Sequence, residues 1–197
     1  MAKKNNKVFY GLSNVHYAVA TYNQETDTYT YGTPVRIPGA VSTSLSAQGS
    51  IDDFYADNGV YDETESNTGY SGDIVFARVI DKFREDVLNE SNGLENANNG
   101  TNEFALLFEF SGDKTHTRYV FYRTRATRPD VASETTTDTK TPKTETLNVK
   151  CTPRLNDGYV KCYVTEDDPA YNDFYTKVYE PADILKAAET AGDLGTV

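Results

Sequence analysis

Apolar and polar residues alternate along most of the chain with the two-residue period that is typical of β-strands. This alternation predicts about eight strands. They are expected over 8–21, 28–37, 41–48 and 72–79 in the first half of the chain, and over 104–110, 118–126, 147–151 and 160–164 in the second half.

The same pattern predicts local details of the strands. The apolar positions of the first strand change register near Ser13, which predicts a β-bulge there. A short polar link joins 8–21 to 28–37, so we expect these two segments to form a hairpin. The segments 147–151 and 160–164 match in parity across an Asn-Asp-Gly turn, which predicts a last hairpin.

One segment has helical spacing instead. Its apolar residues recur at intervals of three and four, and they are Ile80, Phe83, Val87 and Leu88. The spacing predicts a short amphipathic helix that packs these four side chains on a sheet. Asp81 is placed to cap the start of this helix, and Gly93 lies beyond its end. A second short helix is expected over 182–189.

Two long polar segments interrupt the strands, at 51–69 and 133–146. Both are expected to be loops. The first carries a small hairpin at its tip, because two apolar pairs flank an Asp-Asn-Gly turn. The apolar residues of this tip are Phe54, Tyr55, Val60 and Tyr61. The second segment is rich in Thr and too polar to bury itself.

Together these elements predict a mainly β fold, a β-sandwich or partly closed barrel with one flanking α-helix. The segment 104–110 is apolar on both faces, as a central strand would be, whereas 41–48 has a polar second face. No linker divides the chain, so we expect a single β domain over 1–180 and a C-terminal extension over 181–197.

Charge adds a further feature to this picture. The chain has 30 acids against 19 Lys and Arg, and no Lys or Arg lies between Arg36 and Arg78. The acids inside that window are Asp52, Asp53, Asp57, Asp62, Glu63, Glu65 and Asp73. Such a surface repels the phosphates of DNA, whereas a DNA-binding face gathers cations. Cations gather instead in the second half of the chain, which suits a head-to-tail stack of copies as well as ordinary solvated strand faces.

Residues for catalysis or for a cofactor are not evident. The chain has two His and two Cys, too few for a zinc site, and no Gly-x-Ser-x-Gly motif or phosphate-binding Gly-rich loop. The acids of 52–65 lack the spacing of a calcium loop, so a solvated acidic segment is favoured over a bound ion. We therefore expect no enzyme, no cofactor and no metal site. No apolar run approaches the roughly 18 residues of a membrane span, and no export signal is evident. Cys151 and Cys162 are expected to be reduced, with a disulfide as the alternative.

The order of the parts resembles a known family. A hairpin start that reads KVFYGLSNVHYA over 7–18 is followed by the strand 41–48 and the long segment 52–69. The strand 72–79 then runs into the helix IDKFREDVLN over 80–89, and the chain later reads FYTKVY over 174–179. Over nearly its whole length this order resembles the major tail protein of long-tailed bacteriophages, in particular the phi13-type tail tube group from phages of Gram-positive hosts.

The resemblance implies a structural virion protein, without catalytic activity, that forms hexameric rings stacked into the hollow tail tube. Strands of neighbouring subunits would join in a continuous inner barrel. The segment 52–69 would lie between rings, with Phe54, Tyr55, Val60 and Tyr61 as the candidate ring-stacking residues. DNA would pass without specific binding, because an acidic bore disfavours adhesion of phosphates. The implied partners are the chain itself, the tape-measure protein, and the distal-tail and tail-terminator proteins. The implied location is the virion tail, assembled in the host cytoplasm.

A carbohydrate-binding or adhesin-like β-sandwich is the alternative. Tyr17, Tyr22, Tyr29 and Tyr31 would supply its platform for stacking on sugars. The absence of Trp and of an export signal weighs against this alternative.

Overall fold

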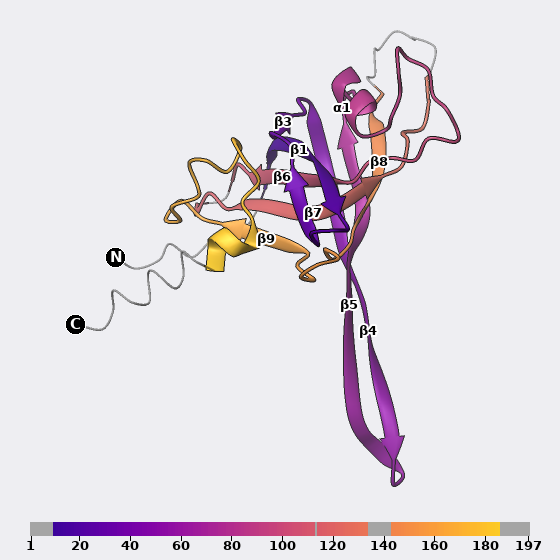
Figure 1. The fold of residues 1–197 in the computed structure, drawn as a ribbon, viewed down its shortest axis with the longest axis vertical. Coiled ribbons are helices and arrows are strands. Elements are labelled where there is room, and N and C mark those ends of the chain that lie inside the picture. Colours follow the sequence, from indigo (N-terminus) through magenta and orange to yellow (C-terminus); the bar gives the residue numbers. More distant parts are fainter. Residues whose placement is uncertain (1–9, 113, 134–142, 186–197) are drawn as a thin grey trace, which may run out of the picture.

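The computed structural model describes residues 10–112, 114–133 and 143–185 (Figure 1). They form one antiparallel sheet in the strand order β2-β1-β6-β7-β8-β5-β4, with β3 paired to β1 and β9 paired to β7. The elements are β1 Leu12–Asn23, β2 Thr28–Tyr31, β3 Val35–Arg36, β4 Ala40–Ala56, β5 Gly59–Phe76, α1 Asp81–Asp86, β6 Phe104–Phe110, β7 Arg118–Ala126, β8 Glu145–Cys151 and β9 Lys161–Val164. The predicted mainly β fold with a flanking helix is confirmed.

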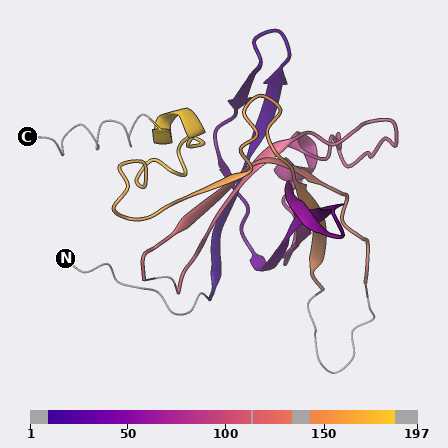
Figure 2. The same ribbon diagram turned by 90° about the horizontal axis from the view of Figure 1, so that it is seen from below.

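The sheet divides at two of its strands. β7 pairs with β6 along one edge, while its other edge is shared by β9 at 118–121 and β8 at 124–126. β1 is shared in the same way between β3 and β2. Part of β4 returns close to β1, so the sheet is strongly curled (Figure 2). This single curled sheet corresponds to the partly closed form of the prediction rather than to two separate layers.

The hydrophobic side chains pack on both faces of the sheet. Successive residues of one strand point to opposite faces, so Leu106 joins one buried cluster and Leu107 joins the other. The first cluster lies between the sheet and α1 and includes Phe83. The second is covered by the described residues that follow β9, 165–185, which we call the C-terminal segment and which contribute Phe174 and Tyr179. β6 is therefore apolar on both faces, as the sequence predicts.

The segment of α1 and its flanking residues packs through the four predicted side chains, of which only Phe83 lies within the helix bounds. Phe83, Val87 and Leu88 are buried, and Ile80 is partly buried against the same cluster. The predicted cap at Asp81 is wrong. Ile80 is the N-cap residue and makes no side-chain cap hydrogen bond, so Asp81 already lies inside the first turn.

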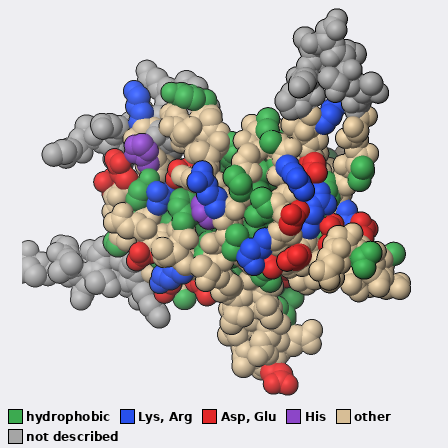
Figure 3. Space-filling view, turned by 90° about the horizontal axis from the view of Figure 1, so that it is seen from above, with side chains coloured by type: hydrophobic (Ala, Val, Ile, Leu, Met, Phe, Trp, Pro, Cys, Tyr) green, Lys and Arg blue, Asp and Glu red, His purple; other side chains and the backbone are tan. Residues whose placement is uncertain are grey.

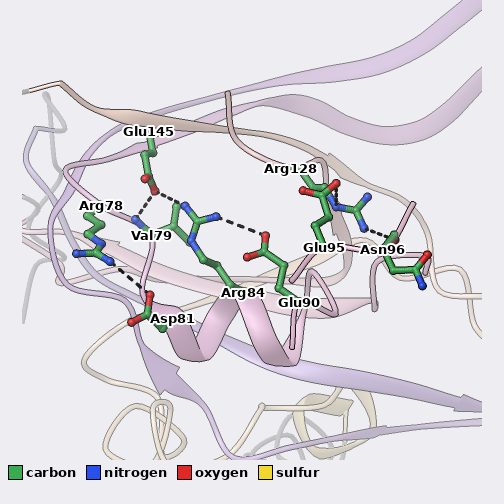
Figure 4. A network of polar contacts seen from close by, with 9 residues as sticks. All are labelled: Arg78, Val79, Asp81, Arg84, Glu90, Glu95, Asn96, Arg128 and Glu145. Atoms are coloured by element: carbon green, nitrogen blue, oxygen red, sulfur yellow. Dashed lines mark hydrogen bonds and ion pairs between the residues drawn. The ribbon is translucent and has the colours of Figure 1, made fainter. Parts of the chain in front are cut away.

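Polar contacts hold α1 instead (Figure 4). Arg84 forms ion pairs with Glu145 on β8, at 3.0 Å, and with Glu90, at 3.4 Å. The Glu145 carboxylate also accepts a hydrogen bond from the backbone N–H of Val79, at 2.7 Å. Glu95, in the loop after α1, forms an ion pair at 2.8 Å with Arg128, which lies just after β7.

One predicted pairing and the extent of one predicted strand are wrong, whereas the predicted pairing of 8–21 with 28–37 is confirmed by β1 with β2 and β3. The segments 147–151 and 160–164 do not form a hairpin, because β8 pairs with β5 and β7 whereas β9 pairs with β7. The predicted strand 28–37 is two strands, β2 and β3, because the chain breaks between them near Pro34, which has no N–H to donate. Parity fixes the face to which a residue points, but not the strand that lies beside it.

The remaining local predictions have mixed outcomes. The bulge near Ser13 is confirmed, since the register of β1 with β6 shifts between Ser13 and His16. Of the expected loop 133–146, the last two residues belong to β8, and 134–142 lie outside the described residues. A helical turn covers 181–185, and the rest of the C-terminal extension also lies outside them.

A candidate assembly surface on the β4–β5 arm

The strands β4 and β5 continue past the rest of the sheet as a long two-stranded hairpin (Figure 1). β8 pairs with β5 only from Tyr70 to Phe76. Beyond that point the hairpin has no further strand beside it among the described residues. We call residues 49–67 the arm. The predicted loop over 51–69 is therefore wrong. Its residues up to Ala56 belong to β4, and those from Gly59 onward belong to β5.

The tip of the arm matches the predicted turn. Asp57 and Asn58 both have left-handed backbone conformations, with φ of 50° and 68°, and they connect Ala56 to Gly59. Asp and Asn tolerate this conformation better than most residues, and two such residues in succession suit a tight hairpin. The flanking strands escaped prediction because Asp, Asn and Gly are poor strand formers and hide the alternation.

Large apolar side chains on the arm are exposed. They are Ile51 at 66%, Phe54 at 62%, Tyr55 at 66%, Val60 at 50% and Tyr61 at 71%. Phe54 and Tyr61 contact each other edge to face, with ring centroids 6.4 Å apart. Four of the five are the predicted stacking residues of the tip. Contiguous exposed apolar side chains are typical of surfaces that bind another protein.

Six of the seven acids of the cation-free window lie on the arm, and the register distributes them over both faces. Side chains directly opposite each other on paired strands share a face. Asp53 lies opposite Glu63, and Glu65 follows on the same face opposite Ile51. Asp52 and Asp62 lie on the other face, and Asp57 is in the turn. The end of the body that faces away from the arm differs, because cations and acids are mixed there (Figure 3).

Asp73 is the one acid of the window within the curled sheet. It lies opposite Ser44 on β4 and Asn148 on β8. The next row across the same face contains Ser46, Ser71, Lys150 and Arg125. The predicted polar face of 41–48 is confirmed, since Ser42, Ser44 and Ser46 are exposed. This face is polar with charges of both signs, so an acidic lining would depend on the arm.

The outer edge of β4 is open. β4 is the last strand in the order, so its second edge has no partner strand among the residues that the structure describes. At 17 residues it is a long edge strand. An open edge of this kind presents unpaired N–H and C=O groups to another chain.

Elsewhere the described residues contain no group of three His, Cys, Asp or Glu side chains arranged to hold a metal ion. Both cysteines are free thiols, as predicted. Cys151 is buried, which raises the pKa of its thiol to about 11. His16 stacks on Tyr175, with ring centroids 4.3 Å apart, and its burial lowers its pKa. A nucleophile that a histidine activates is thus not formed by these groups.

The four tyrosines proposed as a sugar platform do not all lie together. The rings of Tyr22, Tyr29 and Tyr31 are neighbours on the β1–β2 pair, with centroids 4.9 Å and 6.1 Å apart. Tyr17 is fully buried in the cluster under α1, and Tyr29 is only 3% exposed. Tyr31 packs against the opposite cluster, beneath the C-terminal segment. The carbohydrate-binding alternative therefore stays a hypothesis, with Tyr17 outside its platform and Tyr29 largely covered.

No protein-family model matches the chain, and a search of curated proteins found none with significant similarity. None of the helices in the described part of the chain has the length and apolar character needed to cross a lipid bilayer.

Proposed function

We propose that this protein is a structural subunit that assembles with copies of itself into the tube of a long-tailed phage tail. The arm is the observation that carries the proposal. It consists of the outer parts of the 17-residue β4 and the 18-residue β5, extends away from the sheet and exposes apolar side chains at its end. A surface of this kind gains most when a neighbouring subunit covers it.

The energetics of the arm support assembly. A two-stranded hairpin is at best marginally stable in water without further packing. Here the hairpin also places Asp53 opposite Glu63, and like charges directly opposite each other are unfavourable. An isolated arm therefore has little to hold it in shape beyond its own backbone hydrogen bonds. Contacts with a second copy would supply the missing packing.

The open edges of the sheet support a ring. β4 ends the strand order on one side and β2 ends it on the other. Addition of one copy's edge strand to another copy's edge would pair the unsatisfied backbone groups, and a rotation that closes would give a ring. Stacked rings of six subunits are what the resemblance to tail tube proteins implies. Under this proposal the arms reach from one ring to the next.

The proposal includes the passage of DNA without specific binding. The polar face that contains Ser44, Asp73 and Asn148 would line the bore, together with any arm acids that face it. Small polar side chains offer phosphates few strong contacts, and acids repel them. Arg125 and Lys150, in the next row of the same face, would have to be covered by a neighbouring subunit. The tape-measure, distal-tail and tail-terminator proteins would be the further partners. The protein would act in the virion tail, with no catalytic role.

Electron microscopy of the purified protein tests this function. Negative staining across a concentration series should reveal rings or tubes for the full chain. A variant that lacks Ile51–Glu65, with Ser50 joined to Ser66 through an Asn-Gly turn, should remain a folded monomer, because Ser50 and Ser66 already lie opposite each other. Circular dichroism would verify its fold. Wild-type protein that stays monomeric at every concentration, or normal tubes without the arm, would overturn the proposal.

A further inference from the structure

The arm and the curled sheet carry opposite charges that cannot meet within one molecule. On the arm, Asp53, Glu63 and Glu65 lie on one face, and we call them the acidic face. No Lys or Arg belongs to the arm. The three residues are exposed, and none forms an ion pair among the described residues. Their charges are thus balanced only by solvent and salt.

A group of cations lies at the base of the arm. Arg125 and Lys150 are directly opposite each other on β7 and β8, and both are exposed. Arg123 lies nearby, because its guanidinium and that of Arg125 share one carboxylate, Glu103, at 2.9 and 3.0 Å. We call Arg123, Arg125 and Lys150 the basic patch. Arg123 and Arg125 share Glu103, and Lys150 forms no ion pair among the described residues, so the three cations and this one acid carry a net charge of +2.

Asp73 reduces this charge but does not cancel it. It lies in the next row of the same face and forms no ion pair with Lys150 in the described structure. When Asp73 is counted, the patch and its surroundings still carry a net positive charge. The acidic face and the basic patch thus share one unfavourable feature. In each, two like charges lie directly opposite each other on neighbouring strands, Asp53 with Glu63 and Arg125 with Lys150.

The two surfaces are too far apart to neutralise each other in one molecule. Ser71 lies beside Lys150, and Glu63 precedes Ser71 by eight residues on β5, toward the tip of the arm. At about 3.3 Å per residue the separation is roughly 25 Å. Charges interact weakly beyond the Debye length, which is about 8 Å at physiological ionic strength. Opposite charge close enough to compensate either surface must therefore come from another molecule.

We propose that the acidic face of one copy docks on the basic patch of a second copy. This inference rests on the proposed function and names the contact that would join successive subunits. Because the two surfaces differ, the contact is head-to-tail and can repeat without limit. Ile51 and Tyr55 lie on the acidic face with the carboxylates, and both are about two-thirds exposed. Arg123 donates a hydrogen bond to the Pro153 carbonyl, so segment 153–155 borders the basic patch. Its exposed Leu155 could contact Ile51 and Tyr55 of the docked arm.

Charge reversal tests this contact. An arm variant carries Asp53→Lys with Glu63→Lys, and a patch variant carries Arg125→Glu with Lys150→Glu. Each should raise the concentration needed for assembly by about tenfold or more, because like charges then face each other across the interface. An equimolar mixture of the two variants should assemble again, since the reversed arm of one fits the reversed patch of the other. Light scattering and negative-stain microscopy measure both effects.

Controls separate this inference from the proposed function. A variant with Arg78→Glu and Lys82→Glu removes two exposed cations outside the patch and should assemble as the wild type does. If the patch variant does not fold, Arg125→Gln with Lys150→Gln serves instead. Wild-type protein that never assembles would overturn the proposed function and the contact together. Wild-type assembly with unaffected charge variants, or with variants that the mixture does not rescue, would overturn only the contact.

Discussion

Gly69 lies directly against the backbone carbonyl of Cys151, where a Cβ atom would come within 2.0 Å of the oxygen. Gly69 also has a φ of +105°, a conformation that residues with a side chain rarely adopt. The next residue, Tyr70, is the first residue of β5 that pairs with β8. This close approach therefore fixes the point at which β5 separates from the sheet and the arm begins.

Replacement of Gly69 by Ala should destabilise the protein. Both the positive φ and the clash with Cys151 must be accommodated, so we expect a loss of about 2 kcal/mol in the free energy of unfolding. Gly59→Ala is the matched control, because a Cβ at the tip of the arm meets nothing within 4 Å. Urea denaturation measures both variants. Equal stability of Gly69→Ala and wild type would contradict the proposed geometry of the junction.

The packing of the C-terminal segment on the sheet should depend on the buried Tyr122. The hydroxyl of Tyr122 donates a hydrogen bond to the carbonyl of Tyr179, at 3.0 Å, inside the cluster beneath that segment. Tyr122→Phe leaves the carbonyl without this donor and should cost roughly 1 kcal/mol in unfolding free energy. Tyr163→Phe is the control, since Tyr163 is 63% exposed. Protease digestion should also release the C-terminal segment faster from Tyr122→Phe than from the control.

The buried thiol of Cys151 predicts a pH effect. Burial raises its pKa from 9.0 to about 11. At a pH between these two values the thiol is therefore protonated in the folded state and ionised in the unfolded state. The contribution to stability is present below pH 9.0 and is lost as pH rises toward about 11. Cys151→Ala should therefore lose less unfolding free energy across this interval than wild type does. Equal slopes for the two proteins would show that the thiol is not protected from ionisation.

The apolar tip should matter for assembly but not for folding. Phe54→Ser with Tyr61→Ser removes two exposed rings that contact each other and no residue of the buried clusters. We expect an unchanged unfolding midpoint and a higher concentration threshold for tubes, because the tip no longer buries apolar area against a neighbour. Leu94→Ser with Val131→Ser changes two other exposed apolar residues and serves as the control. Tip and control variants with the same threshold would contradict the role of the tip.

Salt should weaken assembly if the acidic face and the basic patch meet. Raising sodium chloride from about 0.15 M to about 1 M shortens the Debye length from about 8 Å to about 3 Å. The wild-type threshold concentration should rise across this range, as light scattering would show. The mixture of the two charge-reversed variants should respond in the same direction, since its contacts are also between opposite charges. A threshold that falls with salt would indicate that apolar contacts dominate the interface.

The sequence determined the features that depend on neighbouring residues in the chain. The continuous apolar run around Leu106 and Leu107 identified a strand buried on both faces, and the spacing of Phe83, Val87 and Leu88 identified the packed side of the segment that contains α1. The Asp57-Asn58 turn was also predictable, because its residue types suit the left-handed conformations that the turn requires. These properties are local, so a single chain without relatives is enough to reveal them.

The tertiary structure decided which strands lie side by side. β8 and β9 have matching parity, yet they pair with different stretches of β7 rather than with each other, because many pairings satisfy the same alternation. The acids form one window in sequence, but the register places Asp53 and Glu63 on one face of the arm and leaves Asp73 in the sheet. Side-chain alternation is set by the backbone of each strand, whereas pairing depends on packing between residues far apart in the chain.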